Sequence, residues 1–250
     1  MHTTAEEKTP TAALFSNGSF QASNGIEIPC RFYFPPDLAE NEELPLYFHM
    51  HGNGSRGADN ERQLTTVGGA LIRRCFAEER RCIYLAPQCI RASQWVNTYA
   101  GDENYDADAP QNPYLVAAWE LFLHFIEDKH IDKHRIYISG GSNGGGATLD
   151  LCCRHPEMFA AAIPMAPTGR IGAYAPSKVA PLLAKTPIWF FHGTADKALS
   201  VDGTRALVAA LRTLGAPVRY TEVEGATHGN IWQITAETPG VLDWLFSQTK

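Results

Sequence analysis

Segment 135–146 reads Arg-Ile-Tyr-Ile-Ser-Gly-Gly-Ser-Asn-Gly-Gly-Gly, an apolar strand pattern that ends in glycines on both sides of Ser142. A helical pattern containing Ala and Leu follows at 144–155. Gly-x-Ser-x-Gly between a strand and a helix is typical of a sharp turn that lifts the serine hydroxyl out of a sheet. Glycines are needed there because a Cβ two positions from the serine would clash where the backbones approach. This context favours Ser142 as a nucleophile over an incidental serine in a glycine-rich turn or a phosphate loop without its lysine.

The same turn predicts donors for a substrate oxyanion. N–H groups at a helix N-terminus face negative charge that develops in front of them, which favours the backbone N–H of Asn143. The segment 48–54, Phe-His-Met-His-Gly-Asn-Gly, closes an earlier strand, and its glycines would let the backbone approach a substrate carbonyl. We expect Asn53 to supply the second donor, with Gly54 as second choice, and His51 to support the loop. A plain glycine turn after a buried strand is the alternative.

Outward from Ser142, apolar runs alternate with amphipathic segments, which is typical of parallel strands joined by crossover helices in an α/β fold. The run Ile188-Trp-Phe-Phe191 is apolar on successive residues, as expected of an interior strand covered on both faces. The N-terminal strands are candidates for antiparallel pairing. The predicted strands are 29–34, 44–49, 82–86, 135–139, 161–165, 187–191 and 218–223, and the predicted helices are 63–79, 114–129, 144–155, 202–214 and 239–248.

Composition narrows the class of protein. The chain has 250 residues, of which 44% are hydrophobic and 19% charged, as in an ordinary globular protein. We expect a single domain over 1–250, with a flexible tail at 1–12. The net charge of −6 and the lack of clustered Lys and Arg argue against a nucleic-acid partner. No apolar run is long enough to span a membrane, so a cytoplasmic protein is expected, or a secreted one if a leader has been removed.

The six cysteines are expected to be reduced, because a core of this size does not need disulfides. Cys152 and Cys153 are adjacent in a helical segment, and no C-x-x-C spacing supports a zinc site. The acidic loop 101–108 lacks the spacing of a calcium loop, so a solvated loop is the simpler interpretation. The sequence therefore predicts neither a metal nor a cofactor.

A serine nucleophile needs an imidazole base and a carboxylate that orients the base. Asp196 follows the strand that ends at 191, and His228 follows the last predicted strand, so both fall at strand ends near Ser142. The resulting chain order, Ser then Asp then His, is the one expected for a strand–serine–helix turn of this kind. Asp202 is the competing acid, but we expect it to be a helix N-cap.

These motifs resemble the α/β-hydrolases described as predicted peptidases and the related dienelactone-hydrolase, feruloyl-esterase and polyhydroxybutyrate-depolymerase-like enzymes. The resemblance covers most of the chain after about Pro29. It implies a mostly parallel sheet of about eight strands, covered by helices on both faces, with a minimal lid. The sequence departs from these families at Asn143, where the turn after the serine often carries Met. It also departs at Gly141 and at Leu199-Ser200. The segments that carry it are 44–57, 85–89 with Trp95, 132–146, 155–161 and 192–196.

The resemblance implies a serine esterase that acts on a small-molecule ester, with a short acyl or an aryl, feruloyl-type group. A peptidase or amidase of the same fold, or a catalytically silent binding protein, are the alternatives. Trp95, Tyr99 and Tyr105 are candidates either for a pocket wall or for packing. The segment between 165 and 187 has room for little more than a loop or short helix, which predicts an open site. A homo-oligomer is compatible with the sequence.

Overall fold

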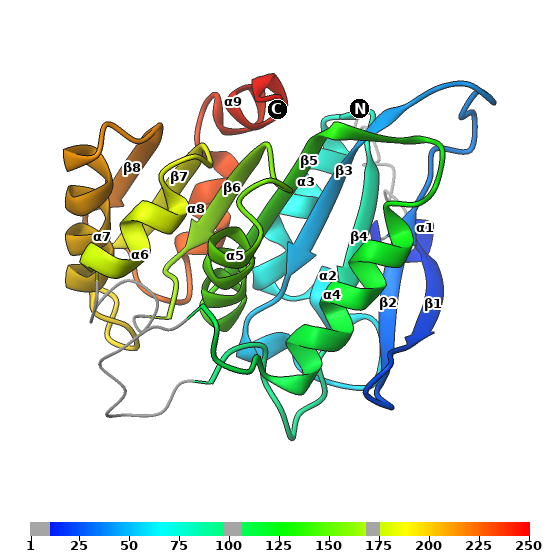
Figure 1. The fold of residues 1–250 in the computed structure, drawn as a ribbon, viewed down its shortest axis with the longest axis horizontal. Helices are drawn as coiled ribbons and strands as arrows, with labels where there is room; N and C mark the ends of the chain where they lie inside the picture. The colour runs from blue at the N-terminus through cyan, green and yellow to red at the C-terminus, as the bar shows by residue number, and fades with distance from the viewer. Residues whose placement is uncertain (1–10, 98–106, 169–175) are drawn as a thin grey trace, which may run out of the picture.

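A computed structural model describes residues 11–97, 107–168 and 176–250 of the protein. They form one eight-stranded sheet with helices on both faces (Figure 1), in the strand order β1-β2-β4-β3-β5-β6-β7-β8. The strands are β1 (Ser16–Gln21), β2 (Glu27–Tyr33), β3 (Leu44–Met50), β4 (Ile83–Pro87), β5 (Ile131–Gly141), β6 (Ala161–Met165), β7 (Ile188–Gly193) and β8 (Val218–Val223). The helices are α1 (Thr11–Leu14), η1 (Asn53–Ser55), α2 (Arg62–Thr65), η2 (Val67–Gly69), α3 (Ala70–Ala77), α4 (Pro113–Phe125), α5 (Asn143–Arg154), α6 (Pro176–Leu183), α7 (Val201–Thr213), α8 (Ile231–Glu237) and α9 (Val241–Ser247).

Strand direction divides the sheet into two parts. β4, β3, β5, β6, β7 and β8 are parallel, whereas β2 pairs antiparallel with β4, and β1 pairs antiparallel with β2. The predicted antiparallel pairing of the N-terminal strands is therefore confirmed. Because parallel strands end at the same edge, the carboxyl ends of β3, β5, β7 and β8 bring distant loops together.

Two hydrophobic clusters lie on opposite faces of the sheet. Helices α4 to α7 pack on one face, and α3, α8 and α9 pack on the other. All seven residues of β3 are buried, which explains why its pattern is continuously apolar rather than alternating. The predicted α/β-hydrolase fold with helices on both faces is confirmed.

Several elements differ from the sequence predictions. The helix predicted at 63–79 is divided by η2, where Gly68 and Gly69 interrupt the α-helical run. Strand β1 was not predicted, because its sequence Ser-Asn-Gly-Ser-Phe-Gln has only one apolar residue. Helix α8 was also not predicted, whereas α6 is the kind of short helix for which the segment between 165 and 187 has room. Of the expected flexible tail 1–12, residues 1–10 lie outside the described part, while Thr11 begins α1.

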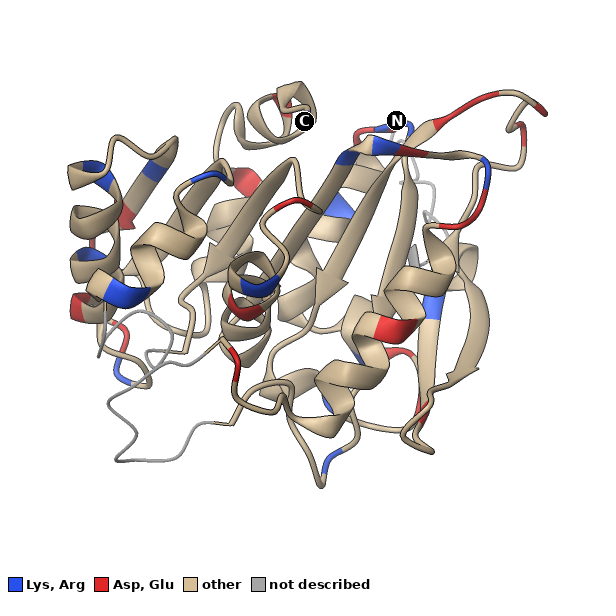
Figure 2. Ribbon diagram, viewed as in Figure 1, with Lys and Arg blue, Asp and Glu red and all other residues tan. Residues whose placement is uncertain are grey.

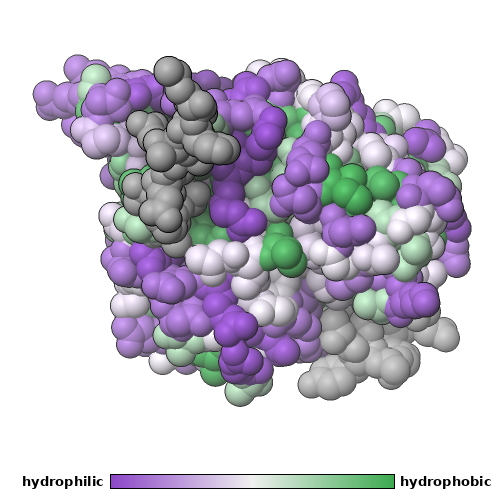
Figure 3. All heavy atoms as spheres, turned by 180° about the vertical axis from the view of Figure 1, so that it is seen from behind, coloured by the Kyte–Doolittle hydropathy of each residue, from purple (hydrophilic) through white to green (hydrophobic). Residues whose placement is uncertain are grey.

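The surface carries both signs of charge. Lys and Arg as well as Asp and Glu are scattered over the ribbon (Figure 2). On the face seen from behind, polar groups predominate and apolar groups occur in separate small areas (Figure 3). No helix among the described residues is long and apolar enough to cross a membrane. The six cysteines are buried, and none of them forms a disulfide with another.

Candidate active site

Ser142 occupies a strained turn between β5 and α5. Its φ of 55° and ψ of −118° lie where non-glycine residues are rare. Such a conformation costs about 1–3 kcal/mol and persists only where the surrounding structure holds it. The neighbouring glycines explain how the turn closes, because a Cβ at Gly140 would overlap the Gly144 carbonyl, and one at Gly144 would overlap the Met50 carbonyl. The turn has the geometry that the glycine spacing predicts.

Asp196 and His228 meet in the loops after β7 and β8. His228 Nδ1 lies 2.6 Å from Asp196 Oδ2, and the Asp196 side chain is fully buried. The other carboxylate oxygen accepts hydrogen bonds from the backbone N–H groups of Ala198 and Leu199, each at 2.9 Å. Burial alone raises the pKa of a carboxyl group, but these hydrogen bonds and the one from His228 hold the pKa of Asp196 below its usual value. Asp196 is therefore ionised at neutral pH and able to orient the imidazole.

His192 is a further neighbour of Asp196 that the sequence motifs did not single out. Its Nε2 lies 3.4 Å from Asp196 Oδ2 and donates to the Leu199 carbonyl at 3.2 Å, while Nδ1 accepts from Thr204 Oγ1 at 2.8 Å. Burial lowers the pKa of His192, so the ring is neutral. A neutral ring beside the carboxylate leaves the charge of Asp196 available to His228. Its position four residues before Asp196 was the one available signal.

Asp202 is separate from this pair. Its side chain is exposed and forms an ion pair with Arg205 at 2.8 Å. The expectation that Asp202 is a helix N-cap is wrong, because Ser200 caps α7 by accepting from the Asp202 backbone N–H. Asp202 lies in the first turn, where its negative charge still interacts favourably with the helix dipole.

Ser142 and His228 line one cavity of about 380 Å³. Its lining residues are Gly52, Asn53, Gly54, Ser55, Thr66, Val67, Gly68, Gly141, Ser142, His228, Gly229 and Trp232. The described hydrogen bonds include none between Ser142 and His228. Such contacts are often long in ligand-free enzymes and shorten when substrate binds. Ser142 and His228 therefore face a common space, and Asp196, which is not among the lining residues, contacts His228.

The loop after β3 approaches the nucleophile closely. A Cβ added to Gly52 would lie 3.0 Å from the Gly141 carbonyl oxygen and 3.4 Å from Ser142 Cβ. Asn53 and Gly54 follow it in η1 and line the cavity. Asn143 begins α5, so its backbone N–H belongs to the first turn, which has no acceptor within the helix. Both predicted donor positions therefore flank Ser142.

Trp95 is not in the cavity wall. Only 1% of it is exposed, its indole Nε1 donates to the His51 carbonyl at 2.8 Å, and its backbone N–H donates to Asn143 Oδ1 at 2.8 Å. The candidate role as a pocket residue is therefore corrected to packing and support. Tyr99 and Tyr105, and most of the acidic loop 101–108, lie outside the described residues.

Trp232 forms the apolar wall that sequence reasoning missed. Its ring lies across the imidazole of His228, with centroids 5.2 Å apart and planes at 81°. It also fills the space where a Cβ of Gly141 would stand. This contact gives a reason for glycine immediately before the nucleophile. The sequence holds only the spacing of four residues between His228 and Trp232 as a hint.

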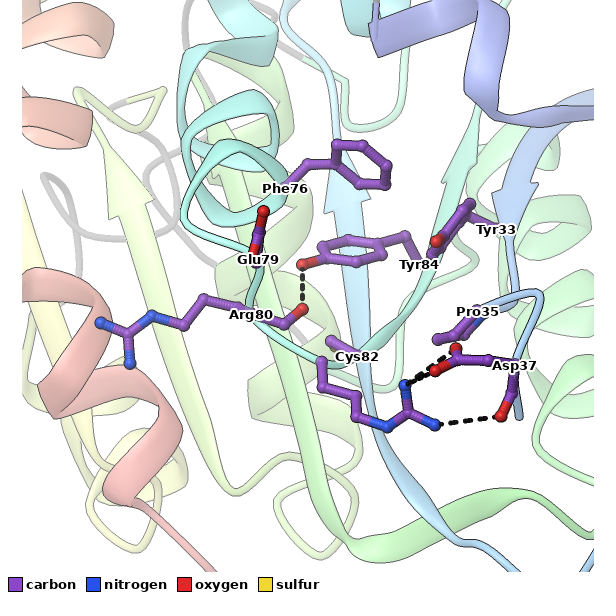
Figure 4. A pocket seen from close by; sticks show the side chains of 9 residues that line it. Tyr33, Pro35, Asp37, Phe76, Glu79, Arg80, Cys82 and Tyr84 are labelled. Carbon is purple, nitrogen blue, oxygen red and sulfur yellow. Dashed lines mark hydrogen bonds and ion pairs between the residues drawn. The ribbon is translucent and has the colours of Figure 1, made fainter. Parts of the chain in front are cut away.

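A second cavity of about 310 Å³ lies at the other edge of the sheet, where β4 begins and β2 ends (Figure 4). Tyr33, Phe76 and Tyr84 provide its aromatic wall. Arg81 is held there by Asp37 at 3.0 Å and by Glu42 at 2.6 Å. Its guanidinium is thus already engaged by carboxylates, and none of the groups of the Ser142 turn occurs there.

Comparisons with known proteins agree with this geometry. Residues 115–178 match the prolyl oligopeptidase family. A thermostable esterase is 30% identical, with a TM-score of 0.82 over 96% of this chain and 64% of that one. The S-formylglutathione hydrolase of Staphylococcus aureus is 14% identical, with a TM-score of 0.68 over 93% of this chain and 98% of that one. An acylaminoacyl peptidase is 17% identical, with a TM-score of 0.64 over 94% and 41% of the two chains. A search of curated proteins gave no match.

The sheet order, the strained serine turn and these similarities define an α/β-hydrolase. The solved structures that share this fold with the chain include esterases and an acylaminoacyl peptidase. This chain spans 64% of the length of the thermostable esterase.

Proposed function

We propose that the protein hydrolyses carboxylic esters through an acyl-enzyme formed on Ser142. The observation that carries the proposal is the 2.6 Å contact between His228 and a fully buried Asp196, beside a serine held at positive φ in the same cavity. Packing alone does not require a buried carboxylate, a partly exposed histidine and a strained serine at one place.

The steps follow from the positions of the groups. Because Nδ1 of His228 faces Asp196, its Nε2 is the nitrogen available to take the Ser142 proton as Oγ attacks the ester carbonyl. The carbonyl oxygen becomes negative and accepts from the backbone N–H groups of Asn143 and Asn53. His228 then returns the proton to the leaving alcohol, and water repeats the sequence to release the acid. No cofactor takes part.

The cavity favours a small and uncharged ester. None of the described residues that line it is Asp, Glu, Lys or Arg, and Trp232 and Val67 supply apolar surface. The segment between β6 and β7 has one eight-residue helix, α6, in its described part, as the short spacing predicted. Each buried methylene contributes about 0.8 kcal/mol to binding. Because the apolar wall is short, a long acyl chain should bind little more tightly than a short one.

Nitrophenyl esters of increasing acyl length test this proposal. We expect kcat/KM to be highest from acetate to butyrate, without activation at a lipid interface. A charged acyl group of matched size, such as a hemisuccinate beside a butyrate, should react more slowly because the described lining offers no counter-ion. A profile that rises steadily through decanoate, or no serine-dependent turnover at all, would contradict the proposal.

Amide hydrolysis is the second candidate, and the match of residues 115–178 to the prolyl oligopeptidase family is the observation that favours it. The same triad serves both reactions, but an amide needs its leaving nitrogen protonated by His228 as the bond breaks. Matched ester and anilide substrates with one acyl group separate the two. A peptidase should retain a substantial part of its kcat/KM on the anilide, whereas an esterase should lose nearly all of it.

A further inference from the structure

Trp95 joins the two loops that flank Ser142. Its backbone N–H donates to the side-chain oxygen of Asn143 at 2.8 Å, and its indole Nε1 donates to the carbonyl of His51 at 2.8 Å. Asn143 begins the helix after the nucleophile, and His51 begins the loop that continues into Asn53. One buried residue therefore contacts both sides of the predicted oxyanion hole.

The Asn143 side chain is committed to this connection. Its Oδ1 also lies 3.4 Å from the Val96 N–H, and its Nδ2 donates to the Val96 carbonyl at 2.9 Å. The whole residue is buried. An amide that is paired on both of its polar atoms with segment 95–96 fixes the first turn of α5 against that segment. This explains why asparagine follows the nucleophile, since a Met there would leave those backbone groups without partners.

The His51 side is equally constrained. Its ring packs against the Trp95 ring with centroids 4.9 Å apart. Nδ1 donates to the Gly52 carbonyl at 2.7 Å, and Nε2 accepts from the Cys89 N–H at 2.9 Å. Burial lowers the pKa of His51 to about 4, so the neutral ring keeps one donor and one acceptor near neutral pH. The carbonyl that Trp95 engages therefore belongs to a loop already fixed at Gly52.

We infer that Trp95 is a positioning residue that sets the separation of the two oxyanion donors, the backbone N–H groups of Asn143 and Asn53. This inference rests on the proposed function, since it assigns no chemistry of its own to Trp95. The donors lie on separate loops, one after β3 and one after β5, and Trp95 contacts both loops. Stabilisation of an oxyanion depends on donors held in place before charge develops.

Trp95→Phe tests the inference directly. It keeps an aromatic ring against His51 but removes the Nε1 donor. A misplacement of about 1 Å in an active site can lower the rate by about 10²-fold, so we expect kcat to fall by about 10- to 100-fold. KM should change by less than about twofold, because the ground-state ester does not yet carry the charge.

Trp189→Phe is the matched control. Trp189 lies in β7 and donates from its own Nε1 to Thr221 Oγ1 at 2.9 Å, and its described ring contacts are with Phe191, Trp244 and Arg219. Both variants lose one indole hydrogen bond, and urea unfolding measures what each loses in stability. The inference predicts that kcat falls for Trp95→Phe and stays near wild type for Trp189→Phe. Equal kcat in the two variants would overturn it.

Asn143→Ala provides a second variant if Trp95→Phe folds poorly. It retains the backbone N–H that would bind the oxyanion but removes the side chain that engages segment 95–96. It should also lower kcat with little change in KM, and the double variant should lose less than the product of the two single losses, because both act on one connection. Fully multiplicative losses would contradict the inference.

Labelling with a fluorophosphonate separates failure of the inference from failure of the proposed function. If the wild type reacts at Ser142 and turns over esters, but Trp95→Phe equals its control, only the positioning role fails. If the wild type neither turns over esters nor reacts at Ser142, the proposed function fails, and with it the inference.

Discussion

The two edges of the sheet carry cavities of similar size but different character. About 380 Å³ lies beside Ser142, and about 310 Å³ lies beside Tyr84. Each has an aromatic wall. The first combines a strained serine with a histidine whose other ring nitrogen, Nε2, has no described hydrogen-bond partner, whereas the second contains an arginine already bound by two carboxylates. Volume alone does not distinguish the edges, and the state of their polar groups does.

The difference follows from strand direction. Loops after β3, β5, β7 and β8 meet at one edge because these strands are parallel, so residues far apart in sequence can form a site there. The other edge gathers turns that lead into β4 and out of β2, and its ion pairs hold those turns together. The first edge therefore contains a strained serine turn and a histidine with one ring nitrogen that has no described partner. At the second edge the arginine is paired with carboxylates.

Removal of the proposed nucleophile should have the largest effect of the changes considered at the two edges. Ser142→Ala deletes the attacking oxygen and relieves none of the packing, so we expect kcat on a nitrophenyl ester to fall by at least about 10⁴-fold with the fold intact. Steady-state kinetics and circular dichroism measure the two properties. Near-native turnover by the purified variant would show that the edge with Ser142 does not carry the catalytic activity.

Exchange of Asp196, the proposed acid, should have the second-largest effect. Asp196→Asn keeps the shape of the side chain but favours the wrong tautomer of the His228 ring. In Ser-His-Asp enzymes this change lowers kcat by about 10⁴-fold. Asp202→Asn, on an exposed residue six positions away, should leave kcat nearly unchanged. A large loss at Asp202 and a small one at Asp196 would reverse the assignment of the acid.

Much of this site was predictable because its signals are local. The glycines around Ser142 and the strand-end positions of Asp196 and His228 are readable in short segments. Trp95 and Trp232 were not, since their roles depend on segments far away in sequence: the Asn143 side chain for the first and the close approach to Gly141 for the second. Tertiary contacts of this kind leave no periodic pattern.

The same distinction applies to the fold. Interior strands such as β3 and β7 have continuous apolar runs and were predicted to within a few residues. β1 was missed because it lies at the sheet edge with an alternately exposed face, and its partner β2 supplies the pairing that its own sequence does not indicate. α8 is short and follows directly after His228, where the glycines suggested only a loop.

Acid should lower the free energy of unfolding through groups at the edge that carries Ser142. Burial lowers the pKa of His49 to about 3 and of His51 to about 4, both at the catalytic edge. Below about pH 6.5 the two histidines bind protons in the unfolded chain but not in the folded protein, where the rings are buried. The free energy of unfolding should therefore fall, as the pH falls, by up to about 1.4 kcal/mol per pH unit for each histidine. Urea unfolding at pH 7.5, 6.5 and 5.5 measures this. A constant free energy of unfolding over that range would contradict the assignment of neutral, buried rings.

The smallest effect is expected at the other edge. Arg81 lies partly exposed between Asp37 and Glu42, and its hydrogen bonds lower the pKa of Glu42 to about 2, so this ion pair persists throughout pH 5.5 to 7.5. Arg81→Gln should therefore lower the free energy of unfolding by the same amount at pH 5.5 and at pH 7.5. Because exposed ion pairs contribute little and the second cavity lacks a nucleophile, kcat/KM should change by less than about twofold. A larger loss of ester hydrolysis, with the free energy of unfolding unchanged, would mean that the two edges are coupled, and the contrast between a catalytic and a structural cavity would no longer hold.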